Sequence, residues 1–138
     1  MKLCNFDPPK NWAEFVEIKD KIPRSVPGVT RFEDDLCFYH QYTKLVPSKT
    51  RLKILNSLIG NSQIKLVRNN FPYLKLIQHL GKVTHYCLWS RLGPLSNNQV
   101  EQEIKKYFPK NLSLWFENIE ATKSIPEIWH CHIFIKED

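Results

Sequence analysis

The sequence predicts an α+β fold, in which N-terminal helices precede an antiparallel sheet of about four strands that carries one further helix. Two patterns predict it. Apolar residues recur at helical spacing through residues 11–60, whereas residues 61–138 contain short β-branched and aromatic stretches. With 138 residues, 42% of them hydrophobic, the chain is predicted to form a single domain, 1–138, with a helical part (1–60) and a β-rich part (61–138) that carries the functional site.

Three helices are expected in the N-terminal part, and each follows a capping signal. Asn11 and Glu14 form a capping-box pattern at the start of the first helix, and Ser48 is expected to cap the third. The ends are marked by proline, which cannot continue a helix, or by glycine, which favours a C-terminal cap. The expected bounds are Asn11–Pro23, Thr30–Pro47 and Ser48–Gly60. Residues 24–28 are predicted to form a turn.

Four strands are expected in the second part, because their residues are β-branched or aromatic and turn residues separate them. They are Gln63–Arg68, Val83–Trp89, Leu112–Phe116 and the terminal stretch Glu127–Asp138. A helix is expected between the second and third strands. It begins with a capping box formed by Ser96 and Gln99 and ends at Pro109.

The terminal strand carries the clearest chemical pattern of the chain. Residues two apart in a strand point the same way, so one face is apolar and is expected to join the core. That face consists of Trp129, Cys131, Ile133 and Ile135. The other face carries His130 and His132, whose positions lie about 7 Å apart along the strand.

Two chemistries fit this histidine pair, and His85 in the second strand is a candidate for both. His132 can act as a nucleophile toward phosphorus, with His130 as its proton-transferring partner. Alternatively, His130, His132 and His85 can ligate a metal ion. The third interpretation is that the histidines are packed core residues of a non-catalytic module that binds nucleic acid or protein.

The charge of the chain favours an anionic partner. The net charge is +6 and the isoelectric point is about 9.2, which suits a nucleotide, another phosphorylated small molecule or a nucleic acid. The basic residues are scattered, so a solvated basic surface explains the charge equally well. Residues beside strand ends, and one strand tryptophan, are candidates for binding phosphate or stacking a base. They are Arg68, Asn70, Lys123, Ser124 and Trp89.

Several classes of protein lack support in the sequence. There is no Gly-rich phosphate loop, no Gly-x-Ser-x-Gly and no Glu-x-x-His, and no cofactor is expected. The four cysteines form no Cys-x-x-Cys pair, and Met1 is not followed by a secretory signal. We therefore expect reduced thiols and a cytoplasmic location, with the nucleus as an alternative. No apolar run is long enough to span a bilayer. The sequence does not determine the oligomeric state, and a homodimer is one of the alternatives.

Four blocks occur in the order of a known family. They are Arg68–Tyr73, His85–Ser90, Trp115–Asn118 and Lys123–His132. In this order they resemble the family named for the fungal N-acetylglucosamine-induced protein, formerly a domain of unknown function. That resemblance implies no established activity.

The chain also resembles, more distantly, the histidine-triad (HIT) superfamily of α+β nucleotide hydrolases and transferases. The matching positions are Asn70, Pro72, Tyr73, His85, Asn118, Ser124, Ile125 and Pro126. The resemblance implies that His132 attacks the α-phosphate to form a covalent nucleotidyl intermediate, with His130 as partner. It also implies that Ser124 and Asn118 contact phosphate. Phe134 stands where the third histidine of the triad belongs, and Glu127–Trp129 is an insertion relative to that superfamily.

Overall fold

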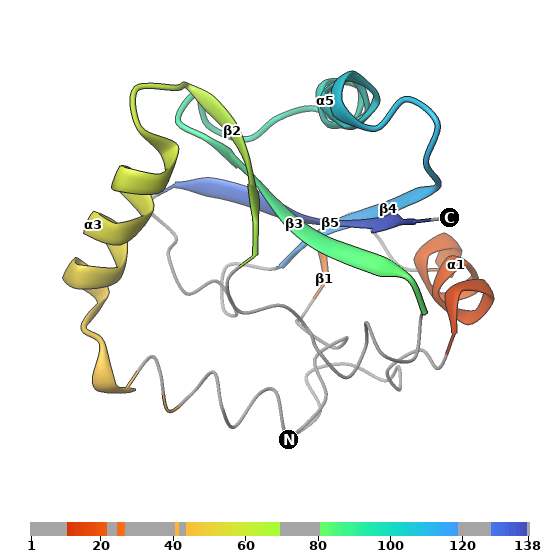
Figure 1. The fold of residues 1–138 in the computed structure, drawn as a ribbon, viewed down its shortest axis with the longest axis horizontal. Helices are drawn as coiled ribbons and strands as arrows, with labels where there is room; N and C mark the ends of the chain where they lie inside the picture. The colour runs from red at the N-terminus through yellow and green to blue at the C-terminus, as the bar shows by residue number, and fades with distance from the viewer. Residues whose placement is uncertain are drawn as a thin grey trace.

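A computed structural model describes residues 11–21, 25–26, 41, 44–69, 81–118 and 128–137. Its helices are α1 (Trp12–Lys21), α3 (Ser48–Ile59) and α5 (Asn97–Tyr107). Its strands are β1 (Ser25–Val26), β2 (Ile64–Arg68), β3 (Val83–Ser90), β4 (Ser113–Asn118) and β5 (Trp129–Lys136). Figure 1 shows the helices arranged around the central sheet. Within the described ranges, no helix is long and apolar enough to cross a membrane.

The described strands form a five-stranded sheet in the order β1-β4-β5-β3-β2. Strands β4, β5, β3 and β2 pair in antiparallel fashion, which confirms the predicted α+β fold and its four antiparallel strands. The fifth strand corrects one expectation. Ser25–Val26 was predicted to lie in a turn, but it pairs in parallel with Glu117–Asn118 at the edge of the sheet. A strand of two residues is too short to show any periodicity in the sequence.

Two of the predicted helix starts have the expected caps. In α1 the Asn11 side chain accepts a hydrogen bond of 2.8 Å from the backbone N–H of Glu14. In α5 both bonds of the capping box are present, at 3.1 Å from the Gln99 N–H to Ser96 Oγ and at 2.8 Å from the Ser96 N–H to Gln99 Oε1. Local capping chemistry therefore sets the start of α1 and of α5.

The start of α3 differs from the prediction by one residue. Pro47, not Ser48, occupies the N-cap position, and no side-chain capping bond is present there. Proline suits the boundary because its ring fixes φ, which is −59° here, and it has no N–H to leave unpaired. Gly60 ends the helix as expected, with φ of 63° and its N–H bonded to the Asn56 carbonyl. The predicted helix Thr30–Pro47 falls mostly outside the described residues.

The two faces of the sheet are covered by different helices (Figure 1). Helix α5 lies on one face, where Val100 and Ile104 pack against the apolar side of β5. On the opposite face, Phe15 of α1 packs against Val83, Phe116 and Phe134. Helix α3 packs on that same face at the other end of the sheet. Its Leu55 and Ile59 belong to a cluster with Cys87, Trp89 and Ile128. The histidine side chains project from this second face, between the contacts of α1 and α3.

Candidate metal centre

The register between β3 and β5 brings three pairs of residues into alignment. His85 is opposite Phe134, Cys87 is opposite His132, and Trp89 is opposite His130. Because side chains two apart in a strand share a face, all six side chains lie on the face opposite α5. His85 was expected to matter only if its strand neighboured that of His130, and the pairing of β3 with β5 meets this condition.

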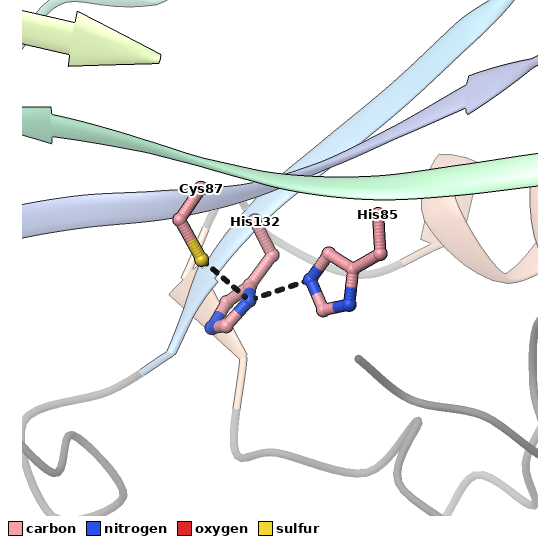
Figure 2. Close-up of side chains that lie close together, drawn as sticks. All are labelled: His85, Cys87 and His132. Carbon is pink, nitrogen blue, oxygen red and sulfur yellow. Dashed lines mark hydrogen bonds between the residues drawn. The ribbon is translucent and has the colours of Figure 1, made fainter. Parts of the chain in front are cut away.

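Three of these side chains converge (Figure 2). Nε2 of His85 lies 2.9 Å from Nδ1 of His132, and Sγ of Cys87 lies 3.7 Å from the same Nδ1. One potential ligand atom from each of the three residues lies within 4.8 Å of the other two. Two of the residues come from β3 and one from β5, so paired strands hold the group in place. We refer to His85, Cys87 and His132 as the His-Cys-His cluster.

The cluster is buried. The exposed fractions are 1% for His85 and 5% each for Cys87 and His132. Aromatic rings surround it, since Phe134 stacks on His85 at 4.3 Å between ring centroids and Phe116 lies 5.5 Å from His132. Buried polar atoms are costly unless they have partners, so the mutual contacts of the cluster also stabilise the fold.

Both contacts within the cluster meet at one nitrogen of His132. A ring nitrogen offers one N–H or one lone pair, directed in the ring plane. Here both His85 and Cys87 approach Nδ1 of His132. A cation bound between the three residues would replace these two contacts with one metal–ligand bond to each residue.

The spacing of the ligand atoms also fits a small metal ion. Nitrogen and sulfur ligands of tetrahedral zinc, at about 2.0–2.3 Å from the ion, lie roughly 3.3–3.6 Å from each other. The distances of 2.9 and 3.7 Å in the cluster bracket this range. The third separation, between Cys87 and His85, is within 4.8 Å. The His-Cys-His cluster could hold a metal if its side chains adjust to bring the three ligand atoms to equal spacing.

His130 lies beside this group and contacts a different ring. It stacks on Trp89 with 4.1 Å between ring centroids and an interplanar angle of 26°. Its ring is 5.3 Å from that of His132, in an edge-on arrangement. The stacking of His130 on Trp89, and of His85 on Phe134, is what the packed-core interpretation of the histidines predicts.

Cys87 is the member that the sequence pattern did not single out. It was expected to be an ordinary core residue, although His85 and Cys87 form a His-x-Cys pair with the same spacing as His130 and His132. That pair was the available signal. It becomes meaningful only once β3 is known to neighbour β5.

The other predicted site residues are placed as follows. Arg68 ends β2 in an exposed position opposite Tyr86, and Asn118 ends β4 opposite Val26. Trp89 is buried against His130. Asn70, Lys123 and Ser124 lie outside the described residues, so their predicted roles in phosphate binding stay predictions.

Comparison with solved structures shows that another protein shares the fold of this chain. A solved structure described as "Crystal Structure of HTC1" superimposes with a TM-score of 0.59 and 16% sequence identity. The alignment covers 93% of this chain and 85% of that one. At this identity the likeness shows a shared fold. No curated protein sequence matches the chain.

The family comparison covers strands β2 to β5 and the His-Cys-His cluster. Residues 41–136 match the family described as "Protein of unknown function (DUF3605)". The expected relation to an uncharacterised family is thereby confirmed, whereas the comparisons confirm neither the fungal N-acetylglucosamine-induced resemblance nor the HIT resemblance. Because the match spans more than half of the chain, the protein belongs to the DUF3605 family of proteins of unknown function.

Proposed function

We propose that this protein binds one transition-metal ion through Nε2 of His85, Nδ1 of His132 and Sγ of Cys87. The observation that carries the proposal is that three ligand-type atoms from two paired strands approach one another within 4.8 Å in a buried position. Rigid strands suit such a site, because binding then requires little ordering of the ligands.

The ligand set determines the class of metal. Imidazole and thiolate ligands favour zinc and neighbouring transition metals, whereas magnesium and calcium prefer oxygen ligands. Three protein ligands leave one position of a tetrahedral zinc site for a further group, which is the arrangement of catalytic rather than structural zinc. Zinc is therefore the ion we propose.

The surrounding residues would support such an ion. The apolar rings of Phe134 and Phe116 border His85 and His132, respectively. A zinc ion with an open position supplies Lewis acidity and lowers the pKa of a bound water. The direction of the open coordination position would be fixed by the ligands, because His85 and Cys87 lie on β3 and His132 lies on the neighbouring β5.

The experiment is metal analysis of protein purified under reducing conditions. Metal is removed with a chelator, zinc is added back, and the bound zinc is counted after desalting. We expect one zinc per chain for the natural sequence and none for a His85→Ala, His132→Ala double variant. Equal zinc in both proteins would contradict the proposal.

A second candidate is a phosphoester-processing enzyme with His132 as nucleophile, either a nucleotide hydrolase or a nucleotidyl transferase. The specific observation in its favour is the 2.9 Å contact from His85 Nε2 to His132 Nδ1, which would orient His132 to attack through its Nε2. The net charge of +6 favours the anionic substrate. We rank it second because it uses only His85 and His132, whereas a metal ion uses all three converging residues.

The nucleophile candidate has its own test. The protein is mixed with a panel of nucleotides and dinucleotides, and thermal shift identifies any that bind. For a nucleotide that is turned over, rapid acid-free quenching followed by mass spectrometry should detect a nucleotidyl adduct on His132. The adduct should be absent from His132→Ala. Turnover by the His132→Ala variant at the natural rate would exclude His132 as the nucleophile.

A further inference from the structure

We propose that the side-chain amide of Asn69 supplies the fourth ligand of this metal centre, through Oδ1. The inference rests on the proposed function, because it concerns the same ion. Asn69 lies directly after β2, and β2 is the strand that pairs with β3.

The first argument is distance. Nδ2 of Asn69 lies 3.3 Å from Nε2 of His85, the atom that also lies 2.9 Å from Nδ1 of His132. A half-turn of the amide exchanges the positions of its oxygen and nitrogen, which are assigned from the hydrogen-bond network. Oxygen and nitrogen ligands that each lie about 2.0–2.1 Å from a tetrahedral zinc ion are separated by roughly 3.3 Å. The amide of Asn69 is therefore at ligand spacing from His85.

The second argument is that the backbone holds Asn69 in place. Its N–H donates a 3.0 Å hydrogen bond to the carbonyl of His85, which continues the ladder between β2 and β3 beyond the pair Arg68 and Tyr86. The residue is also partly buried. The backbone pairing therefore keeps the Asn69 amide beside His85, one of the proposed ligands.

The third argument is chemical. A neutral amide oxygen is a weaker zinc ligand than imidazole or thiolate, so it is the member of the set that a water or substrate atom would displace. A zinc ion bound to one thiolate and neutral ligands keeps a net positive charge. The group that displaces Asn69 is therefore expected to be a water or an anionic oxygen, such as a carboxylate or phosphate.

The test compares two substitutions at one position. Asn69→Ala removes the ligand, and Asn69→Asp replaces it with a stronger oxygen ligand. Zinc affinity is measured by competition with a chromophoric chelator, and the ligand set is followed by ¹¹³Cd NMR. Asn111→Ala is the control, because the Asn111 amide bonds to the Lys136 carbonyl and lies outside the cluster.

We expect the affinity of Asn69→Ala to fall by about 10–100-fold, the range found when groups that support a metal site are removed. Asn69→Asp should bind at least as tightly as the natural chain, with a shifted ¹¹³Cd resonance, and Asn111→Ala should match the natural chain. Equal affinities for Ala, Asp and the natural residue would overturn the assignment. So would an equal loss for Ala and Asp, because Asn69 would then only position His85. A natural chain that binds no zinc would overturn the metal centre itself, an outcome distinct from the other two.

Discussion

Nε2 of His85 and Nδ1 of His132 lie 2.9 Å apart, although 47 positions separate the two residues in the sequence. They are diagonal neighbours on one face of the sheet, because His85 is paired with Phe134 and His132 with Cys87. A one-residue slip of β5 against β3 would turn His132 toward α5 and separate the two rings. The candidate centre therefore depends on the register of these two strands.

The role of Cys87 can be tested against a matched cysteine. Cys87→Ser should weaken zinc binding by at least about 100-fold, since a hydroxyl is a far poorer zinc ligand than a thiolate. Cys131→Ser is the control. Cys131 is fully buried but faces α5, so its variant should keep the natural zinc affinity while losing about 1–3 kcal/mol of stability from a buried hydroxyl. Chelator competition and chemical denaturation measure the two quantities. Equal zinc affinities for the two variants would exclude Cys87 as a ligand.

Substitution of His130 separates two possible ligand sets. The sequence pattern suggested His130, His132 and His85, whereas the convergent atoms belong to His85, Cys87 and His132. His130→Phe keeps an aromatic ring against Trp89, and we expect it to retain one zinc per chain with an affinity close to the natural value. His132→Phe should lose zinc. If His130→Phe loses its zinc while remaining folded by circular dichroism, the set containing His130 is the correct one.

Metal binding should raise thermal stability. At a free zinc concentration of 100 times Kd, binding stabilises the folded state by about 2.7 kcal/mol. For a chain of this length that corresponds to a rise in Tm of about 9 °C. Calcium and magnesium should give no rise, because the cluster lacks the oxygen ligands they prefer. The measurement is differential scanning calorimetry of chelator-treated protein. A calcium shift as large as the zinc shift, or a zinc shift that persists in Cys87→Ser, would argue for non-specific binding.

Helix α1 should contribute directly to the stability of the β-rich part. Phe15 is fully buried against Phe116 and Phe134, so Phe15→Ala should cost about 3–5 kcal/mol. Tyr107→Ala is the comparison, because Tyr107 is 50% exposed and its loss should change stability by about 0.5 kcal/mol or less. Urea denaturation followed by fluorescence measures both. A single cooperative transition would also support the predicted single domain. A Phe15→Ala variant as stable as Tyr107→Ala would show that α1 does not anchor the sheet.

Much of the fold was predictable because its signals are local. The capping residues Asn11 and Ser96 mark two helix starts, and the alternation in Gln63–Arg68 and in residues 128–135 marks two strands. The parallel pairing of Ser25–Val26 was not predictable, because it depends on a distant partner at Glu117–Asn118.

The candidate site was predictable only in part, because its residues come together through the pairing of strands that are distant in the sequence. His130 and His132 form a recognisable pattern, and His85 was identified as a candidate if its strand lay beside theirs. Cys87 looks like any buried cysteine until the register places it opposite His132. The contact of Asn69 with His85 requires, in addition, the pairing of β2 with β3.

Cobalt binding tests the central claim most directly, because cobalt(II) reports both coordination geometry and the presence of a thiolate ligand. Chelator-treated protein is titrated with cobalt(II) under reducing conditions, and the optical spectrum is recorded for the natural chain and for Cys87→Ser. We predict saturation at one cobalt per chain, strong visible absorption typical of tetrahedral cobalt, and a thiolate charge-transfer band that Cys87→Ser lacks. A weak spectrum like that of hydrated cobalt, or a charge-transfer band unchanged in Cys87→Ser, would contradict the metal centre.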